Sequence, residues 1–410
     1  MQRRHFLLGA SAAALPLAGI GGRLFAAPAS SPRFLLVFLR GGYDCANMLV
    51  PYSSEFYYAS RPNIAIARPD SAASAGAPAA DGAARPASAL ALDSDWALAP
   101  ALRDSIGPMF RNKEVAFVPF AGTDDLSRSH FETQDNIERG RPTAGKQDFS
   151  SGFMARLSST LTGKAPAIAF TDALPLTFHG AGDIPNISLR AVGKPAFDKR
   201  QAALLTSMYA GHHLQGAVSD GLQLRQHVAK EFEQEMNAAN RGAINARGFA
   251  IEAQRIGRLM REQYRLGFVD IGGWDTHVNE GGAQGTLANN LDNLGRGLAA
   301  LAQELGNEWK NTVVVVVSEF GRTFRENGNK GTDHGHGSTY WILGGGVRGG
   351  RVVGAQVKVE RATLLEDRDL PVLNDVRDVL GGLFKRLWGL PSDALERVFP
   401  SSTPLDLDVV

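Results

Sequence analysis

Five consecutive valines at positions 313–317 constrain the fold of this chain more than any other feature. β-Branched residues favour extended backbone, and an unbroken apolar run is typical of a strand that is covered on both faces. Similar apolar runs occur at 34–39, 115–118 and 266–271, with helical patterns between them. This alternation of strand and helix predicts an α/β fold built on a mostly parallel, doubly wound sheet.

Two segments carry the clearest helical spacing. Leucines recur every three or four residues from 287 to 305, and Gly306 supplies a stop signal. Asn374 is a candidate cap for a second helix that ends before Gly389. Residues 219–238 and 246–264 are also expected to be helical.

The first 29 residues have the composition of an export leader. Arg3 and Arg4 precede an apolar stretch, and small residues near Ala27 and Ala29 suit a cleavage site. The paired arginines indicate the twin-arginine export machinery as a partner, and a periplasmic or otherwise exported protein. The alternatives are an ordinary export signal or a retained anchor, but proline and glycine interrupt the stretch, so we expect no stable membrane span.

The remainder, residues 30–410, is expected to form a single large α/β domain. Residues 68–90 are mainly alanine, serine, proline, glycine and aspartate, which predicts a low-complexity surface insertion. Residues 141–205 contain several glycines and prolines and predict an irregular excursion that could cap the site.

Charge and cysteine content exclude two classes of protein. The chain has 43 basic and 42 acidic side chains, and loss of the leader removes three arginines and no acid. This near balance gives no electrostatic basis for nucleic-acid binding. Cys45 is the single cysteine, so the chain is not a disulfide-stabilised scaffold, and we expect this residue to fill a small core space.

The stretch 331–337, GTDHGHG, carries the strongest chemical signal. It places Asp333, His334 and His336 close together among glycines, and carboxylate with imidazole suits zinc or manganese. It also follows the valine strand, and ligands of open α/β sheets collect beyond the carboxyl ends of strands. We interpret the three side chains as metal ligands; a solvated glycine-rich loop is the alternative.

The turn after the first strand, LRGGYD at 39–44, offers two more candidates. Asp44 is either a metal ligand or a turn residue that accepts hydrogen bonds from nearby backbone amides. Arg40 either faces an anionic substrate or pairs with an acid.

Two further strands lead into candidate ligands. Asp275 and His277 are two residues apart, so in extended backbone both side chains lie on one face, as a metal half-site requires; a structural turn is the alternative. Glu319 directly follows the valine run, where it either binds metal or pairs with Arg322.

Ser129 stands at the expected start of a helix, where free amides and the helix dipole favour an anion. Beside a metal, its hydroxyl could lose a proton and act as a nucleophile. The alternative is structural, because Ser129 and Glu132 form a capping-box pattern. His130 is interpreted as a ligand or proton donor, with a packing role as the alternative.

Together these segments resemble an exported bacterial family called domain of unknown function 1501. The resemblance rests on the leader, LRGGYD (39–44), RSHF (128–131), GWDTH (273–277), SEFGRT (318–323) and DHGHG (333–337). The family in turn resembles a distant branch of the alkaline phosphatase and sulfatase superfamily. The resemblance implies an α/β/α sandwich with one or two metal ions at the strand ends.

By position, Asp44 resembles the superfamily's first-strand metal ligand, and Asp275 with His277 its mid-chain ligands. Asp333-His334 resembles its Asp-His-Gly pair, with His336 as a further ligand, and Ser129 matches the nucleophile. The spacing of Asp275 and His277 is tighter than in alkaline phosphatases. The Cys-x-Pro-x-Arg signature is absent, so a formylglycine sulfatase is not expected.

The expected function is that of a metal-dependent hydrolase of phosphate or sulfate esters, acting through Ser129 or a metal-activated water. Zinc or manganese is the expected metal, with calcium as a further candidate. Arg40, Arg128 and Arg322 are expected to hold an anionic small-molecule or glycan ester. The rival interpretation is a non-catalytic periplasmic binding protein with a degenerate site, and a metal-bound lyase or transferase is a third.

Overall fold

The computed structural model describes residues 32–70, 87–144, 147–161, 165–189, 199–231 and 248–410. The predicted export leader, 1–29, lies outside these residues, as does most of the low-complexity segment 68–90.

A central sheet confirms the predicted fold class. Its strand order is β10-β5-β9-β8-β1-β7-β6, and β11 pairs with the end of β5. The strands are β1 (Arg33–Leu39), β5 (Val115–Gly122), β6 (Ala167–Ala169), β7 (Leu266–Ile271), β8 (Thr312–Ser318), β9 (Ser338–Leu343), β10 (Arg351–Val352) and β11 (Asn374–Asp375). β1 is parallel to both β7 and β8, whereas β9 runs antiparallel to β5 and β8. All four predicted strands are present, within a mostly parallel sheet.

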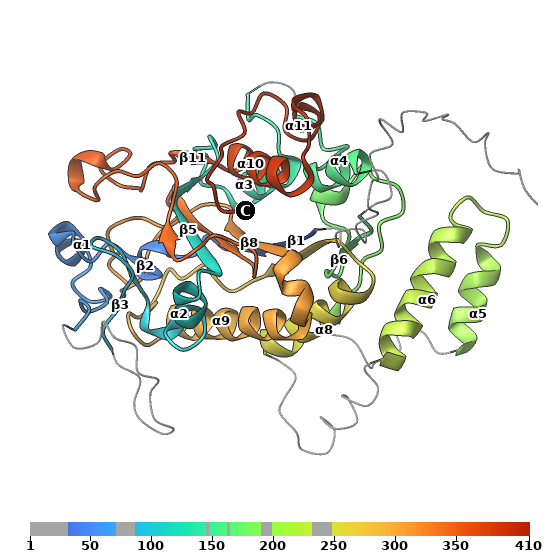
Figure 1. Ribbon diagram of the computed structural model, residues 1–410, viewed down its shortest axis with the longest axis horizontal. Helices are drawn as coiled ribbons and strands as arrows, with labels where there is room; N and C mark the ends of the chain where they lie inside the picture. Colours follow the sequence, from blue (N-terminus) through green and yellow to red (C-terminus); the bar gives the residue numbers. More distant parts are fainter. Residues whose placement is uncertain (1–31, 71–86, 145–146, 162–164, 190–198, 232–247) are drawn as a thin grey trace, which may run out of the picture.

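Helices cover both faces of the sheet, which makes an α/β/α sandwich (Figure 1). One face carries α2 (Ile106–Arg111), α8 (Phe249–Glu262) and α9 (Thr286–Leu305). The other carries α3 (His130–Arg139), α4 (Phe153–Thr160), α10 (Val376–Trp388) and α11 (Ser392–Val398). Alternate residues of β1 enter the two cores: Leu35 and Val37 one, Phe34 and Leu36 the other. This double burial explains why the strand has no polar alternation.

The predicted helices are confirmed, with small shifts at their ends. The leucine stripe lies in α9, and Gly306 is its C-cap. The C-terminal helix is α10, but its N-cap is Asp375, whose side chain accepts a hydrogen bond from the Arg377 amide. Asn374 instead donates to the carbonyl oxygens of Pro119 and Ala355. The expected helices at 219–238 and 246–264 correspond to α6 (Gln215–Glu231) and α8 in the described residues.

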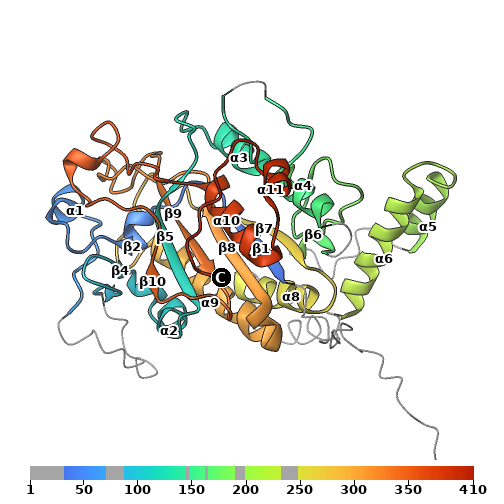
Figure 2. The same cartoon turned by 45° about the horizontal axis from the view of Figure 1, so that its top comes forward.

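The segment 141–205 has more regular structure than its composition suggested. It contains α4, whose apolar face packs in the core, and the edge strand β6. α5 (Lys199–Met208) then forms a hairpin with α6 beyond that edge (Figures 1 and 2). The remaining elements are α1 (Glu55–Ser60), the small sheet of β2 (Leu49–Val50), β3 (Leu90–Ala91) and β4 (Ala97–Leu98), and short 3-10 turns at 45–47, 100–102, 176–178, 306–311 and 361–363. Within the described residues, no helix has the length and apolar character needed to cross a membrane.

The register of the central strands brings their carboxyl ends together. Leu39 at the end of β1 pairs with Ile271 of β7 on one side and with Ser318 of β8 on the other. β5 points the same way as β8, because β9 is antiparallel to both. The loops after these four strands therefore emerge at one edge, as expected of a site in an open α/β sheet.

Candidate metal centre

Four side chains from three of these loops converge at this edge. His130 is the first residue of α3, which follows β5. Asp275 and His277 lie in the loop after β7, and His334 lies between β8 and β9. All four were predicted as site residues, and the fold brings them together from positions more than 200 residues apart.

The ligand atoms of three of them form a nearly equilateral triangle. Asp275 Oδ1 lies 2.9 Å from His277 Nε2 and 3.1 Å from His334 Nε2. The two imidazole nitrogens are themselves 3.1 Å apart. His130 Nε2 approaches the other carboxylate oxygen of Asp275 at 3.5 Å. His130, Asp275 and His334 therefore lie close enough together to share a metal ion, and His277 adjoins them through Asp275 and His334.

The second nitrogen of each histidine is held by a hydrogen-bond acceptor. His334 Nδ1 lies 3.0 Å from the carbonyl oxygen of Arg128, which can only accept, so Nδ1 carries the proton. Burial lowers the pKa of His334, and the neighbouring His130 lowers it further, so the ring is neutral near pH 7. Its Nε2 therefore presents a lone pair toward His277 and Asp275.

Carboxylates accept from the Nδ1 atoms of the other two rings. His277 Nδ1 lies 3.0 Å from Asp333 Oδ1, and His130 Nδ1 lies 2.8 Å from Glu319 Oε1. Metal-binding histidines commonly donate their second N–H to a carboxylate or carbonyl in this way, which fixes the tautomer. Asp333 and Glu319, both predicted as ligands, thus lie behind the imidazoles and orient them.

Lone pairs that face one another at this distance repel unless a proton or a cation lies between them. A divalent cation placed between them would satisfy the facing Nε2 lone pairs of His277 and His334 together with the Asp275 carboxylate. Imidazole nitrogen with one carboxylate oxygen suits zinc, and also manganese. The donor set therefore fits the divalent metal that the sequence predicted, without selecting its identity.

Glu319 is fully buried, and its Oε1 has three hydrogen-bond partners. Besides His130, its Oε1 accepts from the Gly41 amide and from Gln134 Nε2, both at 2.8 Å. Burial opposes its ionisation, but the hydrogen bonds from His130 and Gln134 outweigh burial and lower the pKa of Glu319. In turn, the bond to Glu319 is the largest cause of the raised pKa of His130.

Asp44 departs from its predicted role as a metal ligand. Its carboxylate is buried and accepts from both terminal nitrogens of Arg61, and Oδ1 also accepts from the Ala46 amide. Burial opposes ionisation, but Arg61 overcomes it and lowers the pKa of Asp44. Both oxygens are engaged, so Asp44 anchors the loop after β1.

Arg40 was predicted to face an anionic substrate, and the structure places it in an acidic setting instead. Its Nε lies 3.0 Å from Asp270, one terminal nitrogen lies 2.8 Å from buried Glu138, and the other donates to Gln134. The guanidinium also lies over the Phe38 ring. Its charge is thus already balanced, as the pairing alternative anticipated.

Arg128 and His336 have partners other than the four converging ligands. Arg128 pairs with Asp369 and Glu366, at 2.8 and 2.7 Å. His336 is largely buried, and burial lowers its pKa; the charge of Arg128 lowers it further, and Asp125 opposes the shift. The contribution of Arg128 to the centre is its backbone carbonyl.

Arg322 contacts the centre from the protein interior. One terminal nitrogen donates to Asp275 Oδ1 at 2.6 Å, and its Nε donates to the Thr332 hydroxyl. Its side chain is fully buried, whereas Asp275 is 43% exposed. Arg322 therefore orients a ligand and is not positioned to hold a substrate anion.

Ser129 is the N-cap residue of α3, but its side chain makes no capping hydrogen bond. The capping box with Glu132 is therefore not formed. The partly exposed hydroxyl directly precedes His130 in the chain, so it remains a candidate nucleophile.

Two glycines are required for the loops to meet. Gly41 has φ of +127°, and a Cβ there would lie 2.7 Å from the backbone nitrogen of Asp275. At Gly335 a Cβ would lie 2.4 Å from the carbonyl carbon of Arg322. Both contacts are closer than a side chain tolerates, so glycine lets the ligand-bearing segments pack backbone against backbone.

Arg61, Gln134 and Asn327 are supporting residues that sequence reasoning missed. Arg61 holds Asp44, Gln134 links Glu319 to Arg40, and Asn327 donates to Asp333. Gln134 lies four residues after His130 on the same helix, and that spacing could have indicated a shared face. For Arg61 and Asn327 the sequence carries no comparable signal.

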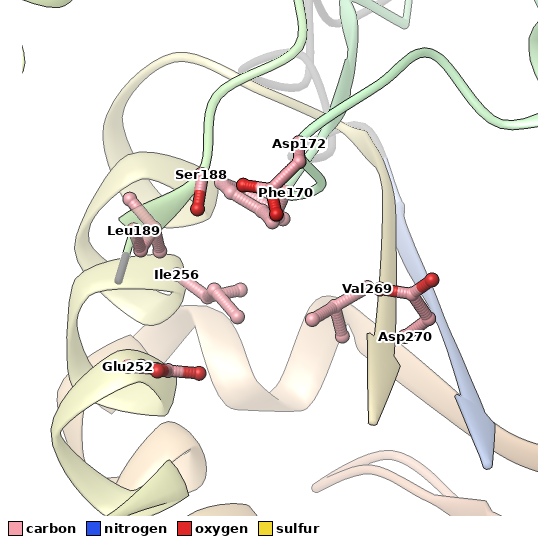
Figure 3. Close-up of a pocket in the computed structure, with 8 residues that line it drawn as sticks. All are labelled: Phe170, Asp172, Ser188, Leu189, Glu252, Ile256, Val269 and Asp270. Atoms are coloured by element: carbon pink, nitrogen blue, oxygen red, sulfur yellow. The ribbon is translucent and has the colours of Figure 1, made fainter. Parts of the chain in front are cut away.

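A separate pocket lies between the β6–β7 edge of the sheet and α8 (Figure 3). Asp172, Glu252 and Asp270 line it together with apolar side chains such as Phe170 and Ile256. None of the four converging ligands lines this pocket, which is therefore distinct from the metal centre.

The fold and this centre define a class: an α/β/α protein with an imidazole and carboxylate site at the carboxyl ends of its strands. The chain belongs to the family described as Protein of unknown function (DUF1501), whose model matches residues 31–399. The match confirms the family that the motifs resembled. No curated protein matches the chain in sequence.

Several solved structures are similar at low identity. One is a protein in the alkaline phosphatase superfamily from Vibrio parahaemolyticus, with 10% identity, a TM-score of 0.37, and coverage of 87% of this chain and 66% of that one. Another is Ps i-CgsB, with 10% identity, a TM-score of 0.37, and coverage of 91% and 75%. Its complex with k-i-k-neocarrahexaose matches at 11% identity and the same TM-score. These likenesses are distant, and the chemistry of the centre is inferred from the residues of this chain.

Proposed function

We propose that the protein is an exported metal-dependent hydrolase of phosphate or sulfate esters. The observation that carries this proposal is the convergence of three imidazole Nε2 atoms on one carboxylate, with every Nδ1 held by an acceptor. His130, Asp275, His277 and His334 would hold one divalent metal. Carbonyl and carboxylate groups that accept from the second nitrogen of each histidine are typical of metal sites.

A bound divalent metal would polarise the ester and lower the pKa of a water or hydroxyl beside it. The residues of the chain supply the rest. Ser129 offers a hydroxyl that no helix cap consumes. Arg322 and Glu319 keep Asp275 and His130 in place. The attacking group is then either the Ser129 oxygen or water.

Because the nearby arginines are already paired with carboxylates, the site favours esters with a single negative charge. Arg40, Arg128 and Arg322 each have carboxylate partners, so none of the three is available to neutralise a second charge on the substrate. A sulfate monoester or a phosphodiester has one charge at the reacting group, whereas a phosphomonoester has close to two at neutral pH. Like charge in a partly desolvated site is unfavourable, so we expect the monoanions to react faster.

The first test is metal content, measured by mass spectrometry on the mature exported protein. We expect about one zinc or manganese ion per chain, lost in His334→Ala and kept in His212→Ala, whose ring lies in the exposed turn between α5 and α6. Turnover of aryl sulfate, phosphodiester and phosphomonoester is then compared with and without zinc, manganese and calcium. Absence of bound metal, even after loading, would overturn the proposal.

The alternative is a non-catalytic binding protein, and the engagement of every predicted anion-binding arginine favours it. The two functions differ in one result. A metal-loaded protein that hydrolyses none of the three ester classes supports binding without catalysis, whereas turnover that disappears with the metal supports the hydrolase.

A further inference from the structure

Two arginines hold His334, one at its side chain and one at its main chain. The backbone carbonyl of Arg128 lies 3.0 Å from His334 Nδ1 and accepts its proton. A terminal nitrogen of Arg368 donates to the backbone carbonyl of His334 at 2.8 Å. The imidazole and the main chain of this candidate ligand are therefore fixed by two different residues.

Both arginines converge on one buried carboxylate, that of Asp369. The Nε and a terminal nitrogen of Arg128 lie 2.9 and 2.8 Å from Asp369 Oδ2. Arg368 donates to Oδ1 at 3.0 Å and to Oδ2 at 2.8 Å. The Asp369 side chain is 0% exposed, so its attraction to both guanidinium groups is screened much less than that of a surface pair.

The backbone of Arg128 has a conformation that needs support. Its φ is +54°, in the left-handed region, which is strained for a residue with a Cβ. Such conformations persist only where the surrounding structure holds them. The backbone angles of Arg128 also set the direction of its carbonyl, so a relaxed backbone would turn this acceptor away from His334 Nδ1.

Asp369 is itself fixed relative to the loop that carries His334. It closes a short hairpin in which its amide and carbonyl pair with those of Leu365, at 3.0 and 2.8 Å. It also forms an antiparallel bridge with Thr323. The Thr323 amide in turn donates to the carbonyl of Asp333, the residue before His334, at 2.9 Å. The carboxylate therefore has a defined place beside the ligand loop.

Arg128 has a second carboxylate partner, which is less able to hold it. Glu366 lies 2.7 Å from a terminal nitrogen of Arg128, but its side chain is 61% exposed. Exposed ion pairs contribute little, whereas removal of one partner from a buried pair is strongly destabilising. The contact with Asp369 is therefore the one that restrains Arg128.

We propose that Asp369 is a positioning residue of the metal centre. It acts through the guanidinium of Arg128: it holds the strained Arg128 backbone so that the carbonyl accepts from His334 Nδ1, which leaves Nε2 free for a cation. The proposal rests on the metal-binding part of the proposed function. It assigns a role in metal affinity to a carboxylate that acts through another residue and not on the ion.

The tautomer of His334 is the direct test, measured by ¹⁵N NMR on metal-free protein labelled at histidine. The His334 signals are assigned by their absence from His334→Ala. We expect the Nδ1–H form in the wild type, at a pH where the ring is neutral. Asp369→Asn keeps the size of the side chain and removes its charge, so it should give a mixture of the two tautomers. Its metal affinity, measured by chelator competition, should fall about ten-fold.

Asp367→Asn is the matched control. Asp367 lies two residues earlier in the same hairpin and also pairs with two arginines, but these are Arg325 and Arg361. Its replacement should leave both the tautomer of His334 and the metal affinity unchanged.

Arg128→Ala removes the same contact from its other side. It leaves Asp369 paired with Arg368, so the buried charge keeps a partner, and it decides the test if Asp369→Asn does not fold. It should also give a mixture of tautomers. In the double variant the loss of metal affinity should be smaller than the product of the two single losses, because both act through one contact.

Retention of the Nδ1–H form in both Asp369→Asn and Arg128→Ala would overturn the inference. So would an equal loss of affinity in Asp367→Asn, because the whole hairpin would then be responsible, and so would fully multiplicative losses in the double variant. A wild-type protein that binds no metal would refute the proposed function instead. The two failures are distinguishable, because the tautomer is measured without metal.

Discussion

Replacement of Asp333 by asparagine tests whether Asp333 binds the metal itself or only orients the ligand His277. Asp333 accepts from His277 Nδ1 at 3.0 Å and from Asn327 at 3.0 Å, so it lies behind the imidazole. Loss of such a partner typically weakens metal binding 10- to 100-fold, or about 1.4 to 2.7 kcal/mol. The Asp333 side chain is 52% exposed, so water can replace part of its effect. Asparagine also keeps an acceptor oxygen. We therefore expect a loss near the lower limit, about ten-fold.

Metal affinity is measured by competition with a chromophoric chelator at fixed pH. Asp275→Asn is the comparison, because Asp275 contributes an oxygen to the ligand triangle itself. We expect Asp275→Asn to lose at least ten-fold more affinity than Asp333→Asn. If the two variants lost metal equally, Asp333 would be a ligand, and the orientation assigned to His277 would be wrong.

Three further predictions concern stability and the nucleophile. Arg61→Met leaves the buried Asp44 carboxylate without its partner and should destabilise the fold by about 3 to 5 kcal/mol in urea denaturation; a loss below about 1 kcal/mol would contradict the buried ion pair. Ser129→Ala removes no cap bond, so its stability should change by less than about 0.5 kcal/mol, and its turnover then distinguishes a serine nucleophile from water. Burial and the nearby Asp44 raise the pKa of Glu280 well above its ordinary value, so the folded state keeps a proton that the unfolded state releases. Stability should therefore fall as pH rises between the ordinary and the folded pKa, by at most about 1.4 kcal/mol per pH unit, and Glu280→Gln should abolish that slope.

The sequence predicted four of the eight strands of the central sheet, those whose apolar signal is local and continuous. A run such as the valines of β8 is buried on both faces and cannot be mistaken for an amphipathic element. β9 was missed, although TYWIL at 339–343 lies between Gly337 and Gly344. Its antiparallel direction is not encoded in any short pattern.

The sequence indicated which residues lie near one another at the strand ends better than it indicated what each side chain contacts. His334 and Asp275 converge because their loops follow aligned strands, which the strand pattern implies. Whether a carboxylate faces a metal or an arginine depends on which partner the fold brings to it. Asp44 meets Arg61, and Glu319 meets His130, and neither partner is adjacent in sequence. Such pairings need the tertiary structure.

The buried contacts beneath the centre show why its ligands can stay open to solvent. Asp275 is 43% exposed and His277 is 38% exposed, yet Arg322, which holds Asp275, is fully buried. Arg322 also bonds Thr332, whose hydroxyl donates to buried Glu280. Asp275 therefore contacts buried polar groups on one side and is exposed to solvent on the other. Buried partners of this kind fix the position of a side chain while its outer edge stays accessible to a ligand.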